Sequence, residues 1–193
     1  MDHVTANFFT IPIGIGSCLL FIASRFDKEE ISFLTDNGTH YNEISLLLLF
    51  SFLYFAIDLV LMIKYYKPKY LIYFVHHLVA MRSIIIVYFQ NYILIKFLLG
   101  YLTFELTSPI LRICVSYQRR GINNYISKIL NVCALFLFII IRIIFGTYLF
   151  IVFAQFIYPM SEIYWYIILP FILQSMNFYW LYRIIYFFFG KEM

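Results

Sequence analysis

Two adjacent histidines, His76 and His77, lie inside a long apolar stretch, and one aspartate, Asp58, lies in the apolar stretch before it. Ionisable side chains are costly in hydrocarbon and persist there only with partners or a function. A carboxylate that accepts a hydrogen bond from one imidazole nitrogen fixes the tautomer and makes the other nitrogen a better base. These three residues therefore predict a general base or a nucleophile of the kind that acyl-transfer enzymes use.

The composition places this stretch in a membrane. Of the 193 residues, 64% are hydrophobic and 12% are charged, whereas a soluble domain has roughly 45–50% apolar and about 25% charged residues. We therefore predict an all-α membrane protein with a single domain over residues 1–193. The net charge of +4 does not indicate a nucleic-acid partner, because the basic residues lie beside apolar stretches, as the positive-inside rule requires. The three cysteines form no CxxC pair, and no metal site is expected.

The apolar stretches predict six transmembrane helices. A crossing needs about 20 predominantly apolar residues. The fifth stretch is longer than this, so we expect it to be tilted, or bent at Gly146. The first is short and rich in glycine and proline, and it is the weakest of the six. The predicted spans are residues 7–23, 43–64, 70–89, 92–115, 125–156 and 162–189.

The charges of the connecting segments orient these helices. Basic and non-basic connections alternate along the chain, which places both termini in the cytoplasm. The basic connections follow the second and fourth spans and contain Lys67, Lys69, Arg119 and Arg120. The sequon that begins at Asn37 falls in the first connection, on the lumenal side, and predicts glycosylation there.

Depth in the membrane predicts that Asp58 meets the histidine pair. Asp58 lies six residues before Lys64, and His76 lies seven residues after Lys69, so both lie roughly 10 Å inside the membrane at 1.5 Å per residue. The short connection makes the second and third helices antiparallel neighbours. Because adjacent helical residues point about 100° apart, one histidine is expected to face Asp58 and the other a cavity.

A second polar layer is predicted at about 20 Å by the same rise. It contains Arg82, Glu105, Arg142 and Asn177, and Gln174 lies one turn from Asn177. Glu105 with Arg142 is the first pair that we expect. Polar pairs between transmembrane helices commonly hold the bundle together, and we prefer this structural interpretation for the deep layer.

Several blocks in order resemble the TLC domain family, which includes the ceramide synthases. The resemblance is closer to the small TLC-domain-containing proteins and is best supported over residues 43–185. It implies helices that enclose a lipid-sized cavity, usually in the endoplasmic reticulum. The cavity residues that we expect are Arg112, Glu105, Arg142, Asn177 and Trp180. The blocks are Asp58 with Tyr65-Tyr66, His76-His77, FELTSPILRI at 104–113, RIIFGTY at 142–148 and NFYWLYRII at 177–185.

The chain departs from the ceramide synthases at two places. Ala80 stands where they have a threonine after the histidine pair, and their following His-Asp cluster is absent from Thr103–Thr107. The homeodomain found in some of them is also absent. The paired histidines carry over and the acidic cluster does not, which weakens the case for N-acylation of a sphingoid base.

Two hypotheses for function follow. The first is a lipid acyltransferase that uses acyl-CoA as co-substrate and has no resident cofactor. In it His76 or His77 is the base or the acyl acceptor, oriented by Asp58, and Lys67, Lys69, Arg119 and Arg120 contact CoA phosphates. The second is a non-enzymatic factor for lipid binding, lipid trafficking or membrane composition. A membrane lipid is the partner in both, and a homodimer is compatible with both. Haem ligation is disfavoured, because adjacent histidines on one helix cannot bind opposite faces of a haem.

Overall fold

The computed structural model describes residues 3–26, 41–65, 71–90, 94–159 and 164–189, and all regular structure in these ranges is helical. The chain divides into two compact units, Met1–Leu106 and Thr107–Met193. Among the described residues, four helical stretches are long and apolar enough to cross a membrane: Asn42–Lys64, Leu71–Phe89, Ile95–Arg119 and Tyr125–Ile157. Several apolar helices of this length indicate an integral membrane protein. The six-span topology and the cytoplasmic termini stay predictions.

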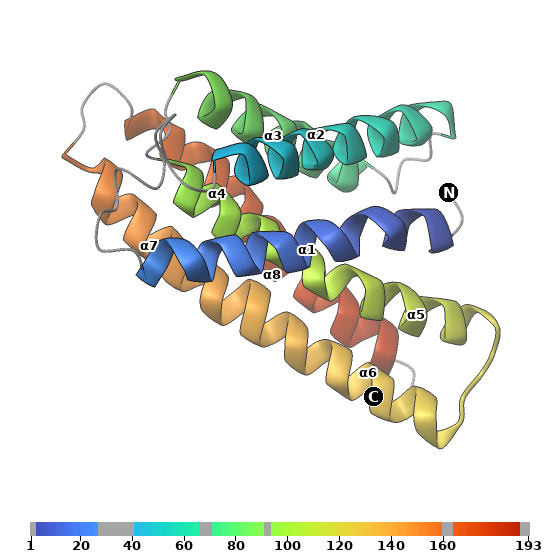
Figure 1. Ribbon diagram of the computed structural model, residues 1–193. Coiled ribbons are helices and arrows are strands. Elements are labelled where there is room, and N and C mark those ends of the chain that lie inside the picture. Colours follow the sequence, from blue (N-terminus) through green and yellow to red (C-terminus); the bar gives the residue numbers. More distant parts are fainter. Residues whose placement is uncertain (1–2, 27–40, 66–70, 91–93, 160–163, 190–193) are drawn as a thin grey trace. The chain divides into compact units, whose positions relative to one another are not determined.

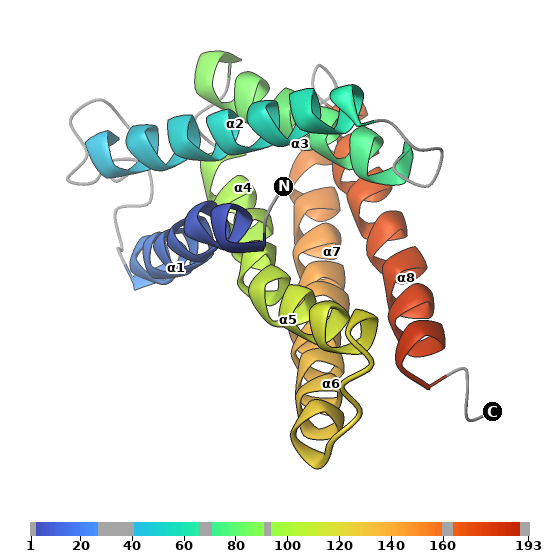
Figure 2. The ribbon, with the colours of Figure 1, turned by 90° about the vertical axis from the view of Figure 1, so that its right-hand side faces the viewer.

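The first unit is built from α1 (His3–Phe26), α2 (Tyr41–Lys64), α3 (Leu71–Gln90) and α4 (Ile95–Leu102). The pair α2 and α3 has the most extensive packing between any two described elements, and α1 packs on both α2 and α4. Figures 1 and 2 show α2 and α3 side by side. The second and third predicted spans therefore form the expected helical hairpin.

Two glycines explain how α1 packs so closely on its neighbours. A Cβ at Gly14 would come within 2.7 Å of the backbone nitrogen of Leu106, and a Cβ at Gly16 would come within 3.3 Å of a methyl group of Leu47. Small residues let transmembrane helices approach at the backbone. The glycines that weakened the prediction of the first span thus serve packing, and α1 runs for 24 residues with Pro12 inside it.

A stretch of 3₁₀-helix, η4 (Thr103–Thr107), joins α4 to α5 (Ser108–Arg119). Pro109 occupies the first turn of α5, where its missing N–H costs little. A change from α to 3₁₀ geometry before a proline is a common break in a long helix. The boundary between the two units falls inside this stretch, after Leu106.

The second unit contains α5, α6 (Tyr125–Phe138), a π-helix η5 (Ile139–Phe145), α7 (Gly146–Ile157), η6 (Tyr164–Ile167) and α8 (Ile168–Phe189). The segments α6, η5 and α7 form one continuous rod (Figure 1), and α8 packs against all three. The irregularity of the fifth predicted span is this π-helix, which ends immediately before Gly146.

A tight turn reverses the chain between α5 and α6. Gly121 has φ of +70°, a conformation that glycine adopts at no steric cost. The Ile122 amide donates to the Tyr117 carbonyl at 3.0 Å, as in a Schellman C-cap. Asn124 then caps α6 by accepting from the Ser127 amide at 2.9 Å. The basic residues Arg119 and Arg120 are exposed at this turn.

Candidate functional site in the first unit and a polar cluster in the second

The α2–α3 pair brings Asp58 and His77 into direct contact. The Nε2 nitrogen of His77 lies 2.6 Å from Oδ2 of Asp58, and their side chains are 7% and 21% exposed. This distance is short even for a charge-assisted hydrogen bond. The predicted contact between Asp58 and one of the two histidines is confirmed, and the histidine in contact is His77.

This hydrogen bond determines which nitrogen of His77 can act as a base. An ionised carboxylate only accepts hydrogen bonds, so the proton between the two groups is assigned to Nε2. In the neutral ring the lone pair then lies on Nδ1. That nitrogen is buried and has no hydrogen-bond partner within the described part of the chain. If His77 acts as a base or nucleophile, the atom that does so is therefore Nδ1.

Aromatic side chains from α2 hold both imidazoles. Phe55 is 2% exposed, and its ring centroid lies 5.2 Å from that of His77 and 6.0 Å from that of His76, edge-on to the second. Tyr54 lies 6.2 Å from His77 on the same measure. Edge-to-face and tilted ring pairs of this kind are favourable. Both imidazoles are thus packed against α2, and each ring has a defined orientation.

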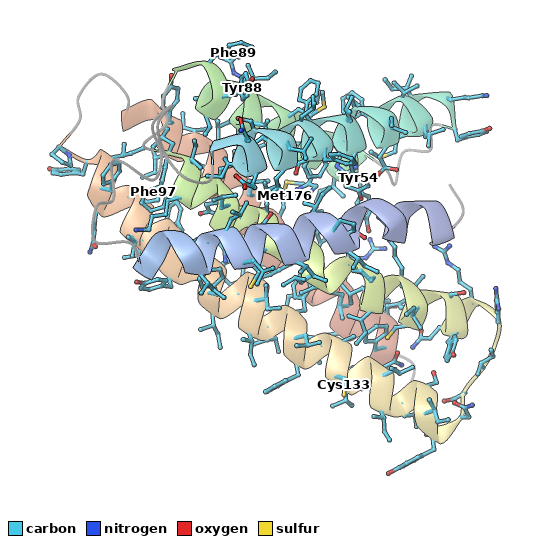
Figure 3. All side chains as sticks on the ribbon, viewed as in Figure 1. Tyr54, Tyr88, Phe89, Phe97, Cys133 and Met176 are labelled. Atoms are coloured by element: carbon cyan, nitrogen blue, oxygen red, sulfur yellow. The ribbon has the colours of Figure 1, made fainter. Side chains whose placement is uncertain are left out.

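The sequence interpretation missed this aromatic support. Tyr54 and Phe55 lie four and three residues before Asp58, which places all three on one face of α2. Two aromatic residues one turn from an intramembrane acid were therefore the available signal. Tyr54 is labelled in Figure 3. The other histidine, His76, is half-buried, and its ring centroid lies 5.4 Å from that of His77.

The second unit holds a separate polar cluster around Arg142, which lies in the middle of the π-helix and is 5% exposed. Its Nε donates to the Thr107 hydroxyl at 2.8 Å, and its Nη2 donates to the Ser108 hydroxyl at 3.1 Å. The guanidinium carbon also lies 5.4 Å and 5.6 Å from the ring centroids of Phe138 and Trp180. Hydrogen bonds and cation–π contacts together stabilise this buried cation.

Two amides of α8 continue the cluster. Gln174 donates to the backbone carbonyl of Arg142 at 3.2 Å and to the Thr147 hydroxyl at 3.1 Å. Asn177 donates to the side-chain oxygen of Gln174 at 3.2 Å. The Oδ1 atom of Asn177 is buried without a hydrogen-bond partner among the described residues. Arg142, Gln174 and Asn177 thus form one connected network that links α8 to the π-helix.

The remaining predicted residues divide into three groups. Glu105 is buried in the first unit and Arg142 belongs to the second, so their pairing stays a prediction. Arg112 is half-buried on α5, and Arg82 is exposed on α3. The predicted phosphate contacts Lys67 and Lys69 and the predicted glycosylation site Asn37 lie outside the described residues.

Comparison with known proteins identifies the family of this chain. The model of the TLC domain family matches residues 1–186. A TLC domain-containing protein of Acanthamoeba polyphaga mimivirus is 39% identical over 194 residues, which cover 96% of this chain and 92% of that protein. No solved structure matches the chain. The family match extends over nearly the whole sequence and includes both polar groups, so the chain belongs to the TLC domain family.

Proposed function

We propose that this protein is a membrane-embedded enzyme of lipid metabolism that transfers a fatty acyl group from acyl-CoA to a hydroxyl or amine of a membrane lipid. The observation that carries the proposal is the 2.6 Å contact between Asp58 and His77, together with the buried Nδ1 lone pair on the same ring. Members of the TLC domain family are commonly linked to lipid metabolism, and the resemblance to ceramide synthases favours the endoplasmic reticulum as the membrane.

The chemistry has two routes through the same nitrogen. In the first, Nδ1 of His77 removes the proton of the acceptor hydroxyl or amine while that group attacks the thioester carbon. The C–S bond then breaks, and the CoA thiolate takes the proton. In the second, the imidazole nitrogen attacks the thioester carbon and expels CoA as its thiolate. The acceptor lipid then displaces the imidazole from the acyl group, and the proton that the acceptor loses passes to the thiolate. Asp58 stabilises the positive charge that develops on the ring in both routes.

The basic connections suit a CoA co-substrate. Arg119 and Arg120 are exposed, and a guanidinium binds phosphate oxygens through two parallel hydrogen bonds. We include Lys67 and Lys69 in this role on sequence grounds. If these cations bind CoA, neutral substitutions raise KM for acyl-CoA and leave the maximal rate almost unchanged. If they only set topology, KM stays constant.

A second candidate function is non-enzymatic lipid binding. Two observations favour it. His77 is only 5% exposed, and Ala80, one turn after it, is buried and supplies no hydroxyl at the position where ceramide synthases have a threonine. In this function the buried Nδ1 accepts a hydrogen bond from a lipid headgroup. The lipid is then bound and released unchanged.

Mass spectrometry of the purified protein incubated with fatty acyl-CoA separates these functions. The enzyme releases free CoA and forms acylated lipid, and the second route leaves an acyl group on a histidine peptide. The variant with both His76→Ala and His77→Ala is expected to release no CoA, form no acylated lipid and carry no acyl group. Unchanged acyl transfer by this variant rules out the mechanism, whereas co-purified lipid without any CoA release favours the binding function.

A further inference from the structure

A groove of about 450 Å³ lies between α2 and α3, at the ends of these helices that are away from Asp58 and His77. Its floor includes Leu48 and Ile84, which are 2% and 4% exposed. Its sides include Leu49, Phe52 and Ile85, and Tyr88 lies towards its far end. Figure 3 labels Tyr88 near the end of α3. The volume falls within the range of roughly 300–1,000 Å³ that is usual for ligand sites.

The groove is apolar where it approaches the histidines and polar only at its other end. The lining residues nearest to the Asp58–His77 pair are Phe52 and Ile84, both purely hydrocarbon. The polar lining residues lie near the start of α2 and the end of α3. A hydrocarbon chain therefore suits the groove, whereas a charged headgroup in its middle would lose its hydration without gaining a partner.

The groove and the histidine pair lie along one seam. Phe52 precedes Asp58 by six residues and Ile84 follows His77 by seven, so the groove begins about 10 Å from the pair at 1.5 Å per residue. Phe89 follows His77 by twelve residues and marks a distance of about 18 Å. One leaflet of acyl chains fills about half of the roughly 30 Å hydrocarbon core. A chain of membrane-lipid length that starts at His77 is therefore long enough to reach the far end of the groove.

The groove is also open to the outer surface of the helix pair, where some of its apolar lining side chains are exposed. Leu49 is 54% exposed and Ile85 is 37% exposed. In a membrane-spanning helix pair, side chains exposed in this way face hydrocarbon. A fatty acyl chain can therefore enter sideways and does not need to pass through the polar pair.

We infer that this groove holds the distal part of the fatty acyl chain whose carbonyl carbon lies at His77, and that its side chains set the chain length that is accepted. The inference rests on the proposed function and adds an acyl-chain subsite to it. For an acyl-CoA taken up from water, each methylene placed in the groove improves affinity about fourfold. Chains that are too short to reach Phe52 gain nothing from it.

The test uses the full-length protein in phospholipid nanodiscs and a long-chain acyl-CoA with a diazirine at its methyl end. After irradiation, peptide mass spectrometry is expected to locate the label on α2 between Asn42 and Phe52 and on α3 between Ile84 and Phe89. Excess unlabelled acyl-CoA of the same chain length should prevent this labelling. Label on other helices, absence of label, or labelling that the competitor does not reduce overturns the inference.

Substitutions give a second measurement. Leu49→Trp is expected to fill the groove without disturbing its buried floor and to shift the preferred acyl chain towards shorter lengths in competition labelling. The matched control is Leu53→Trp, at a position on the same helix that is 45% exposed and does not line the groove. An equal shift in both variants, or none in Leu49→Trp, contradicts the assignment.

The labelling result is separable from catalysis. The variant with His76→Ala and His77→Ala should still be labelled in the groove, because the groove contains neither residue. If the wild type is labelled there but transfers no acyl group, the groove is supported as an acyl-chain site and the enzymatic function is contradicted. If the wild type transfers acyl groups but is labelled elsewhere, the function stands and the groove assignment fails.

Discussion

The two buried polar groups of this molecule differ in what they can do with a proton. In the first unit, Asp58 and His77 share one short hydrogen bond, and the second ring nitrogen has a lone pair and no partner among the described residues. In the second unit, Arg142 donates to two hydroxyls, and amides extend its network. Each group contains a buried acceptor atom with no hydrogen-bond partner in the described part of the chain, Nδ1 of His77 in the first and Oδ1 of Asn177 in the second. An imidazole nitrogen can act as a base, whereas an amide oxygen cannot, so the first group is suited to chemistry and the second to holding helices.

The surroundings of the two groups sharpen this difference. Aromatic rings of α2 pack against the imidazoles, and the Asp58 carboxylate forms a hydrogen bond with that of His77. The Arg142 cluster lies in a π-helix, and Gln174 donates a hydrogen bond to the backbone carbonyl of Arg142. Turns of this type are frequent at functional sites, yet in this cluster the irregular turn is part of a hydrogen-bonded scaffold. The location of a structural irregularity is therefore a weaker guide to catalysis than the presence of a titratable atom.

The largest expected effect is on His77. His77→Ala should lower acyl transfer by about 10²–10⁴-fold, because general base or nucleophile function is lost. It should also lower thermal stability, because Asp58 and Phe55 lose the ring that they contact, while helix content changes little. His76→Ala, the neighbouring half-buried position, is the matched variant and should lose less activity. Rates of acyl-CoA consumption by both purified variants provide the measurement. Equal rates for His77→Ala and the wild type would contradict the assignment of the chemistry to the Asp58–His77 pair.

The next effect is on the orientation of the imidazole. Asp58→Asn keeps the size of the side chain but removes its charge, and an amide can donate to Nε2 and move the lone pair away from Nδ1. We expect a loss of about 10²-fold or more in acyl transfer. Imidazole ¹⁵N chemical shifts should change in the same variant. Activity that falls without any change in these shifts would point to a disturbed fold and away from tautomer control.

The third prediction concerns stability in the second unit. Arg142→Met should lower the free energy of unfolding by about 2–3 kcal/mol, because two hydroxyls lose their donor and two rings lose a cation. Unfolding in a mild detergent by titration with a denaturing one gives the measurement. If this variant unfolds like the wild type but loses all acyl transfer, Arg142 belongs to the reaction and the contrast between the two groups is wrong.

A smaller effect is expected at the amide that links α8 to the π-helix. Gln174→Leu retains the bulk of the side chain and removes its two donor contacts and its acceptor contact, so we expect a loss of about 1–2 kcal/mol of stability. Ser175→Ala is the control, since that hydroxyl bonds only within its own helix, to the Phe171 carbonyl. A larger loss of stability in the control than in Gln174→Leu would contradict the network.

The smallest expected effect is at Phe55. Phe55→Leu removes the ring that packs against both imidazoles but keeps an apolar side chain, and aromatic pairs of this kind contribute about 0.5–1.5 kcal/mol. We expect a small loss of stability, together with lower acyl transfer, because both rings become freer to rotate. Phe55→Tyr, which preserves the ring, should restore the rate. A rate that Phe55→Leu leaves unchanged would show that this packing is structural only.

The sequence predicted the site in the first unit better than the cluster in the second. Depth counted from Lys64 and Lys69 was sufficient to bring Asp58 and the histidines together, because a short connection forces the two helices to be antiparallel. It could not identify which histidine meets Asp58, because that depends on the rotation of each helix about its axis. The π-helix has no signal of its own, since Ile139–Phe145 contains neither proline nor glycine.

The first span shows why composition alone was misleading. Gly14 and Gly16 lower the apolar character of α1, yet they allow the close approach of Leu106 and Leu47. A propensity argument treats glycine as a weak helix former, whereas packing between membrane helices favours it. Which effect dominates depends on the partner helix, and the partner is not visible in a single stretch of sequence.

The unequal lengths of the helices couple this protein to the thickness of its bilayer. The stretch Tyr125–Ile157 has 33 residues and is about 50 Å long, so it is longer than a hydrocarbon core of about 30 Å even when tilted. The stretch Leu71–Phe89, which carries both histidines, has 19 residues and is only about 28 Å long. A thicker bilayer therefore causes hydrophobic mismatch at the histidine-bearing helix first, and a thin bilayer near 27 Å accommodates it without deformation.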